Sequence, residues 1–585
     1  MADGFLQRYA EELGALRKRA SRFASAHPKI AGRLRISGEQ VDDPHVERLL
    51  QGFAFASARV RQKLDDEFPE LTGSLLETLY PHYLAPVPSM MMVRLHPVAG
   101  LESIQRVARH TEIAAEPVED ERCRFRLTQA IDLAPVRVTE ADLCGQPIEA
   151  PLAPRWSAAA CLRLKLGTLA PVPSVAALGL RRLAFHIQAP LREASALHEL
   201  LCNHTLGVAL ARHSGDREPV FLPSSSLRAG GFETDEAMLP YPPSSFTGYR
   251  ILSEFFALPQ KFLFVELTGL ERWSGETLEV FVYLDRTDPA LERLVSAETF
   301  ALNAAPAVNL FRQRAEPIVV DGRRTEYALV PDARRHQTRE VYGVESVTLT
   351  DRSGVRLVAP RFFEGSSPDA PAWQLRRRFD PLDNTSDVTI AFAGDGDDEL
   401  VAGIETLCLN RDLPERLPFG GGHPHLVPVD AQAAIGRIEA LSAPTGALRF
   451  AGDEDRQWRL LSHLNLNHLS LTGGDGSALK EMLRLYVRPE RREANLLIDA
   501  IVGVSSRSTH SRVGSGGMVP GTDVTLVFEP GLIDRGAAYL FASVIDRFLG
   551  LYATINSFTR LRAEMRGQDE PVALFPARLA ERPLL

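Results

Sequence analysis

The chain has 585 residues, of which 45% are hydrophobic and 24% are charged. This composition is close to the average for folded globular proteins and excludes disordered, collagenous and fibrous chains, and the length predicts more than one domain. Acidic residues outnumber basic ones, 75 to 66, so the formal net charge is -9. A chain with this balance lacks the basic field that attracts nucleic acid, and we expect no nucleic-acid partner.

The cysteine pattern and the lengths of the apolar segments indicate the cellular compartment of the protein. The five cysteines are odd in number and form no CxxC pair, which argues against a disulfide framework and a zinc ribbon. The N-terminus lacks the unbroken apolar stretch of a secretory signal, and no window approaches 18 uninterrupted apolar residues. We therefore expect a cytoplasmic protein without direct membrane insertion.

The first ninety residues are expected to be helical. Apolar residues recur at steps of three and four over residues 5–23 and 45–68, which is the period of amphipathic helices. Asp43 followed by Pro44 is a typical helix start. We predict an N-terminal helical region over residues 1–90.

An acidic group lies at the end of the second predicted helix. Asp65, Asp66 and Glu67 are consecutive, and Pro69 is expected to begin a third short helix that Pro81 stops. On a helix these three carboxylates point in different directions, so they do not converge on a metal ion or form a catalytic pair. We interpret them as surface charges beside the positive end of the helix dipole.

From about residue 91 the apolar residues occupy alternate positions, as in the runs RCRFRLT and RRLAFHIQA, which is typical of strands. Turn clusters such as DRSG and FGGGHP separate these runs. We predict two β-rich domains over residues 91–305 and 306–478, the first with an embedded helix near residues 192–203. With the helical N-terminus, this indicates the α+β class.

The last region, residues 479–585, is predicted to mix helices and strands and to contain a long amphipathic helix over 537–563. Its apolar residues form a narrow seam: Leu540, Val544, Phe548, Leu551, Ile555, Phe558 and Leu561. Two interpretations of the seam stay open. It contacts a helix of another subunit, or it packs inside its own domain.

Candidate catalytic motifs are weak. HELLCNH resembles a zinc-protease motif, but Cys202 occupies the position of the second histidine, four residues after His198. A zinc-dependent hydrolase that uses His198, Glu199 and Cys202 is the alternative to a non-enzymatic protein. His423 and His425 form a pair that lacks further ligands in the sequence. No phosphate-binding loop, dinucleotide fingerprint or nucleophile elbow is present, so we expect no cofactor and no enzyme activity.

Several long segments resemble one family. They include HPKIAGRL, DPHVERLLQGFAFASARVRQKLDDEFPELTGSLLETLYPHYLAPVPSM, LPYPPSSFTGYRILSEFFALPQKFLFVELTGL, LCLNRDLPERLPFG and FLGLYATINSFTRL. They are similar to the signature segments of TssF, also called ImpG or VasA, a baseplate subunit of the bacterial type VI secretion system. The segments occur in the expected order over nearly the whole chain.

The resemblance implies a structural protein similar to the baseplate wedge proteins of contractile phages. It implies assembly with TssG, with two copies of this chain per TssG, and with TssK and TssE around the VgrG spike, so that the tail tube and sheath polymerise. It also implies contact with a second copy of the chain and with the secretion membrane complex, at the cytoplasmic face of the inner membrane.

The candidate partner-binding residues come from the two predicted amphipathic segments. The expected mechanism is burial of apolar stripes between subunits, with flanking charges that set the choice of partner. The candidates are Leu64, Asp65, Asp66, Glu67 and Phe68 in the first segment, and Phe548, Leu551, Tyr552, Ile555, Asn556 and Phe558 in the second.

Overall fold

The computed structural model describes the chain except residues 1–8, 11, 12, 15, 21, 22, 24, 25, 34, 35, 38, 39, 42, 154, 155, 243, 244, 363, 365–370, 381–384, 394–399, 450–458, 461–471, 473–475, 489, 513–517, 552, 554–556 and 580–585. For residues 33, 36, 37, 40, 41, 60–72, 74, 380 and 512 it describes the backbone alone. The chain divides into two compact units, Met1–Tyr80 and Pro81–Leu585. It belongs to the α+β class.

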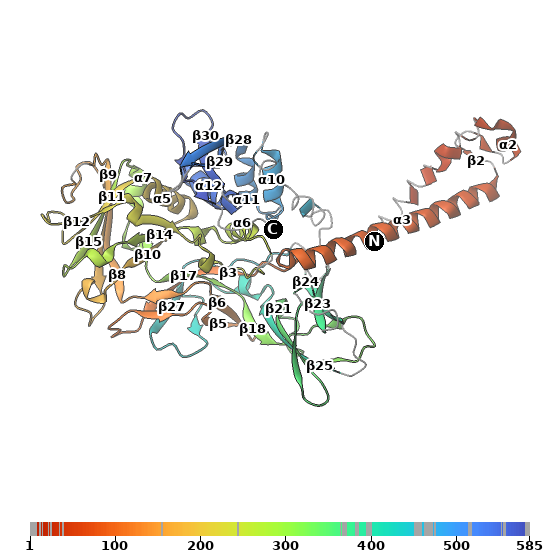
Figure 1. Cartoon of the computed structure of the whole chain (residues 1–585), viewed down its shortest axis with the longest axis horizontal. Helices are drawn as coiled ribbons and strands as arrows, with labels where there is room; N and C mark the ends of the chain where they lie inside the picture. Colours follow the sequence, from red (N-terminus) through yellow and green to blue (C-terminus); the bar gives the residue numbers. More distant parts are fainter. Residues whose placement is uncertain are drawn as a thin grey trace. The chain divides into compact units, whose positions relative to one another are not determined.

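The first unit consists mainly of helices (Figure 1). Helix α2 (Pro28–Arg33) is followed by the paired strands β1 (Ile36–Ser37) and β2 (Gln40–Val41) and by the long helix α3 (Pro44–Leu79). Asp43 caps α3, since its carboxylate accepts a hydrogen bond from the backbone nitrogen of His45 at 2.8 Å. The helix start predicted from Asp43 and Pro44 is confirmed.

The predicted break at Pro69 is wrong. Helix α3 continues through this residue to Leu79, so the second and third predicted helices are one. Proline lacks the amide hydrogen that would bond to the carbonyl of Asp65, which costs the helix one hydrogen bond. The flanking residues are mostly good helix formers, and starting a new helix would require a second unfavourable nucleus. Continuing one helix through Pro69 therefore costs less free energy than starting a second helix there.

The second unit begins with the short helix α4 (Pro81–Leu84) and contains a six-stranded sheet. Its order is β26 (Val427–Pro428), β5 (Glu112–Val118), β6 (Glu121–Leu127), β17 (Ala304–Val308), β3 (Met90–Pro97) and β27 (Ile435–Ala440). Cys123, Phe125 and Leu127 of β6 are all fully buried, as their alternation predicts. Strand β17 contains residue 306, where the second predicted β-rich region begins, and β27 of that region pairs with β3 of the first. The two predicted β-rich regions therefore share this sheet.

Two further sheets and a strand pair come from residues 105–301. One sheet has the order β12 (Val220–Pro223), β11 (Thr205–Ala211), β15 (Leu278–Leu284), β9 (Ala160–Thr168) and β8 (Val136–Gly145). The other has the order β13 (Leu227–Gly230), β14 (Phe264–Thr268), β10 (Arg182–Ile187) and β16 (Phe300–Ala301). Strands β4 (Gln105–Val107) and β7 (Ile131–Leu133) form the pair. The helices in this stretch are α5 (Leu191–Asn203), α6 (Gly248–Ala257) and α7 (Pro289–Leu294).

Residues 311–409 form a separate β-rich part around their own apolar core. One sheet has the order β18 (Phe311–Arg314), β25 (Leu400–Leu409), β21 (Glu340–Thr350) and β22 (Arg356–Ala359), and β19 (Ile318–Val320) also pairs with β25. The second has the order β20 (Tyr327–Ala328), β24 (Thr385–Ala393) and β23 (Ala372–Asp380).

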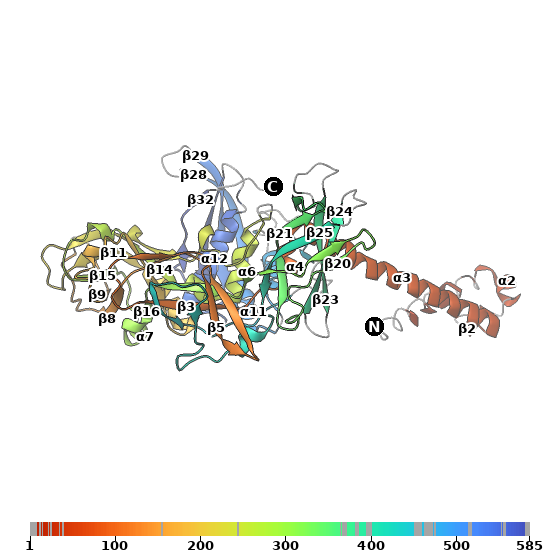
Figure 2. The same ribbon diagram turned by 90° about the horizontal axis from the view of Figure 1, so that it is seen from below.

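The C-terminal part combines helices and strands. Helices α10 (Ser477–Arg484) and α11 (Arg492–Asp499) precede a sheet of β28 (Ile501–Arg512), β29 (Met518–Phe528), β30 (Phe558–Met565) and β31 (Ala573–Leu574), and β32 (Arg578–Leu579) pairs with β30. Strands β29 and β30 are parallel, and α12 (Arg535–Leu551) connects them. Figures 1 and 2 show α12 alongside β28, β29 and β30. This arrangement is a β–α–β unit.

The predicted long helix over 537–563 is therefore wrong in its second half. Helix α12 ends at Leu551, and Phe558 and Leu561 lie in β30. The sequence Ala-Thr-Ile-Asn-Ser-Phe-Thr that follows Tyr552 is rich in residues with low helix propensity. Pairing of β30 with β29 over residues 558–565 outweighs the helical spacing of the apolar residues. None of the helices formed by the described residues is long and apolar enough to cross a membrane.

Candidate functional sites

Helix α3 carries exposed apolar side chains. Leu49 is 73% exposed and Phe53, four residues later, is 64% exposed, so both lie on one face of the helix. Ala54 and Ala58 are fully buried on another side. The ion pair between Arg17 and Glu47, at 2.5 Å, ties α3 to the preceding helical segment of the same unit. Leu49 and Phe53 thus form an apolar surface, here called the α3 patch, that is available for a partner.

The predicted acidic group lies further along α3. The backbone of Leu64, Asp65, Asp66, Glu67 and Phe68 is helical, as expected, and their side chains are outside the described part of the chain. The assignment of these residues to a partner contact remains a prediction.

The candidate residues near α12 do not share one exposed face. Phe548 is fully buried in α12, and Phe558 is 1% exposed in β30, so the chain's own elements cover both rings. Phe548 contacts the rings of Phe246 and Tyr249, with centroid distances of 6.3 and 5.8 Å. Leu551, at the end of α12, is 38% exposed. Tyr552, Ile555 and Asn556 lie outside the described residues. In this conformation the buried part of the seam packs internally.

The zinc-protease resemblance on α5 does not correspond to a convergent site. His198 Nε2 lies 3.6 Å from the Cys202 sulfur, and burial lowers the pKa of His198 to about 4. Glu199 instead bonds His204 Nε2 at 3.0 Å and Arg535 Nε at 3.1 Å. Burial would raise the pKa of Glu199, but the hydrogen bond and charge of His204 and the charge of Arg535 lower it. These contacts stabilise the fold between α5 and α12 and favour no hydrolase.

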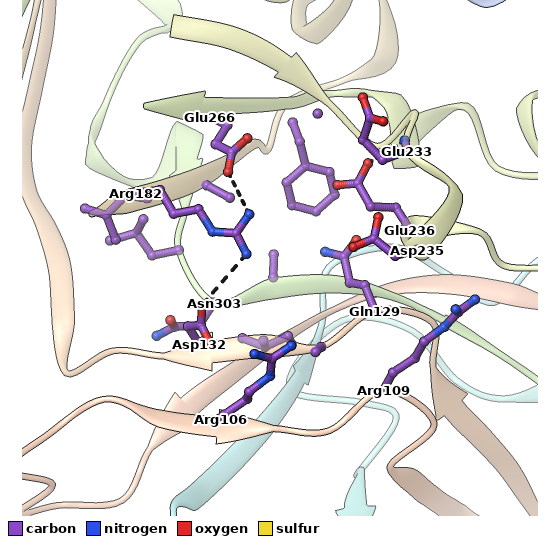
Figure 3. Close-up of a pocket in the computed structure, with 18 of the residues that line it drawn as sticks. Arg106, Arg109, Gln129, Asp132, Arg182, Glu233, Asp235, Glu236, Glu266 and Asn303 are labelled. Atoms are coloured by element: carbon purple, nitrogen blue, oxygen red, sulfur yellow. Dashed lines mark hydrogen bonds and ion pairs between the residues drawn. The ribbon is translucent and has the colours of Figure 1, made fainter. Parts of the chain in front are cut away.

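A cavity of about 550 Å³ opens between β4 and β7 on one side and β10 and β14 on the other (Figure 3). Its lining mixes arginines with carboxylates, and two of the arginines pair with two of the carboxylates. Arg182 donates to Glu266 at 3.1 Å and lies 3.9 Å from Asp132, and Arg228 donates to Glu266 at 2.8 Å. Its lining residues, all of them described, include no histidine, cysteine, serine or lysine. The sequence did not predict this cavity, since its walls come from segments far apart in the chain.

Glu116, His423 and His425 form the one group in the described part of the chain in which at least three metal-ligand side chains converge. Their ligand atoms all lie within 4.8 Å of one another. The sequence shows the histidine pair without a third ligand and predicted no metal site, because Glu116 lies 307 residues before His423. Only the pairing of β5 with β26 reveals the third side chain.

Comparisons with known proteins agree with the resemblance seen in the sequence. A family model described as "Type VI secretion system, TssF" matches residues 1–582. The chain is 34% identical over 606 aligned positions to the type VI secretion system component TssF1 of Pseudomonas aeruginosa PAO1, with 96% of this chain and 97% of the relative covered.

Two solved structures share the fold. A chain of a TssK-TssF-TssG baseplate subcomplex of the type VI secretion system, determined by cryo-electron microscopy, matches with a TM-score of 0.75 and 26% identity. That match covers 92% of this chain and 99% of the other. A chain of the baseplate complex from the type VI secretion system matches with a TM-score of 0.59 and 24% identity over 99% of this chain and 100% of the other, which shows the fold alone.

Proposed function

The chain belongs to the TssF family and is a structural component of the type VI secretion system baseplate, and from this premise we propose how it assembles. It joins TssG and TssK in a baseplate wedge, with two copies of this chain per TssG. The observation that carries this proposal is the fold match, at a TM-score of 0.75 over 92% of the chain, to a protein solved together with TssK and TssG.

The α3 patch is the proposed contact with TssG. Leu49 and Phe53 are 73% and 64% exposed on one helical face. When a partner covers large exposed apolar side chains, the free energy of the complex is lowered. Burial of apolar surface contributes about 25 cal/mol per Å². A helix with such a stripe pairs readily with an amphipathic helix of another subunit.

The acidic residues Asp65, Asp66 and Glu67, with Leu64 and Phe68, form a second proposed contact on the same helix. Charges beside an apolar contact influence partner choice and association rate more than affinity. The double substitution Asp65→Lys/Glu67→Lys tests this. It should slow the association with TssG and reverse its salt dependence, whereas unchanged association kinetics would exclude the contact.

The wider assembly follows from the same proposal. The wedges close around the VgrG spike with TssE, and the ring nucleates the tail tube and sheath at the cytoplasmic face of the inner membrane, in contact with the secretion membrane complex. The protein acts by binding and positioning, without a catalytic step. This role needs several surfaces rather than one pocket.

Co-purification tests the proposal directly. The full chain is co-expressed with TssG and TssK from the same gene cluster, and the complex is analysed by size-exclusion chromatography with light scattering. We expect a stable complex with more copies of this chain than of TssG. Separate elution of the three proteins would overturn the proposed function.

A further inference from the structure

The sheet register places an acidic side chain opposite a histidine. Strand β26 pairs antiparallel with β5, with Val427 opposite Ala114 and Pro428 opposite Ile113. Continuing this register by two residues sets His425 opposite Glu116. Glu116 also lies in the irregular part of β5, where its pairing with β6 shifts between Ala114 and Pro117. Such bulges redirect side chains and are common at the edges of binding sites.

A tight glycine turn positions the second histidine. Gly420, Gly421 and Gly422 have φ angles of 97°, 62° and 93°, in the left-handed region that glycine adopts at little cost. The turn closes with backbone hydrogen bonds in both directions between Gly420 and His423, at 3.2 and 3.1 Å. This fixed turn brings His423 to within hydrogen-bonding distance of β5.

The three side chains contact one another. His423 Nδ1 lies 2.8 and 3.1 Å from the two carboxylate oxygens of Glu116, and the rings of His423 and His425 are 4.3 Å apart. The side chains of Glu116 and His423 are 19% and 41% exposed, so an ion from solvent can reach the group.

We propose that Glu116, His423 and His425 form a binding site for a divalent transition-metal ion of the zinc class. Two imidazoles and one carboxylate are a ligand set that zinc accepts, and imidazole favours late first-row ions over magnesium or calcium. The site is distinct from the proposed contacts on α3 and adds a binding activity to the structural role.

The geometry requires only small adjustments. Zinc holds nitrogen and oxygen ligands at about 2.0–2.2 Å, so tetrahedral ligand atoms lie roughly 3.4 Å apart. The present ligand atoms are within 4.8 Å of one another. Binding of zinc would require side-chain rotations of His423 and His425 that shorten these distances. Water would occupy the fourth position. The bound ion links β5 to the glycine turn.

Zinc binding by the full chain tests the proposal. The protein is prepared without a polyhistidine tag, with Cys144→Ser to remove the exposed thiol as a competing ligand, and it is stripped with EDTA. Zinc ions are added during isothermal titration calorimetry, and metal content is measured after dialysis. We expect one zinc ion per chain and a higher melting temperature with zinc. Cobalt ions should give the visible absorption of a tetrahedral site.

Three ligand variants and one control locate the site. Glu116→Gln, His423→Ala and His425→Ala should each weaken zinc binding by at least about 100-fold, since even outer-shell partners change metal affinity by about 10–100-fold. His336→Ala removes an exposed histidine elsewhere and should leave binding unchanged. Melting temperatures in EDTA verify that each variant folds. Failure of the parent chain to take up stoichiometric zinc, or unchanged affinity in His425→Ala, would overturn the proposal.

Discussion

Arg449 and Glu340 form an ion pair in which the side chains are only 2% and 1% exposed. Arg449 Nη2 donates to Glu340 Oε2 at 2.7 Å, and Ser386 donates to Glu340 Oε1 at 2.8 Å. Arg449 also donates to Asp412 at 2.8 Å. Burial lowers the pKa of Arg449, but the contacts with Glu340 and Asp412 outweigh burial and raise it. The pair joins the start of β21 to the segment after β27.

Arg449→Met should destabilise this part of the protein by about 3–5 kcal/mol, because it leaves the carboxylate of Glu340 buried without its counter-charge. The measurement is the urea midpoint followed by fluorescence. Arg416→Met is the matched control, since Arg416 and its partner Glu119 are 57% and 58% exposed, and its effect should stay below about 1 kcal/mol. Equal shifts for the two variants would contradict the assignment.

Buried neutral histidines should make the protein sensitive to acid. Burial lowers the pKa of His186 to about 4, although its ring donates to the carbonyl of Gln260 at 3.1 Å. The unfolded chain binds a proton near pH 6.5 while the folded chain does not, so stability is lost as the pH falls from about 6.5 to 4. The loss is about 1.4 kcal/mol per pH unit for this group.

His186→Gln should therefore reduce the slope of melting temperature against pH in this range, whereas His336→Ala, at an exposed position, should not. Scanning calorimetry at several pH values measures both slopes. An unchanged slope in His186→Gln would show that His186 does not couple protonation to unfolding.

Leu49→Asp/Phe53→Asp tests the α3 patch. Because both side chains are mostly exposed, we expect an unchanged melting temperature of the isolated chain together with loss of TssG binding in a pull-down assay. Leu152→Asp is the control, since Leu152 is 93% exposed in the other unit. If the double variant still bound TssG, the patch would not be the contact.

Phe548→Ala tests the internal role of α12. Truncation of a fully buried phenylalanine should cost about 3–5 kcal/mol. Leu551→Ala, at a 38% exposed position, should cost far less. Denaturation midpoints distinguish the two. A stable Phe548→Ala chain that failed only in complex formation would instead support a contact with another subunit.

Local patterns predicted much of the fold. Asp43 and Pro44 marked the start of α3, and alternation identified strands such as β6. Two predictions failed for different reasons. Pro69 does not end α3, because the flanking helix formers continue the helix at the loss of one hydrogen bond. The pairing of β30 with β29, a long-range contact, makes residues 558–565 a strand instead of a helix. The helical spacing of apolar residues does not predict which strands will pair.

The candidate metal site shows the same limit. The pair His423 and His425 is visible in the sequence, but Glu116 joins it only through the register of β5 and β26. The cavity around Arg182 and Glu266 is likewise assembled from distant strands. A sequence motif shows ligands that are neighbours in the chain, whereas the fold brings together residues hundreds of positions apart.

The mass of the complex with TssG shows whether this chain assembles as a baseplate subunit. Light scattering on a size-exclusion column, with the chain alone and co-expressed with TssG, gives the copy numbers. We expect a stable complex with two copies of this chain per TssG. A chain that elutes as a monomer regardless of TssG would contradict it.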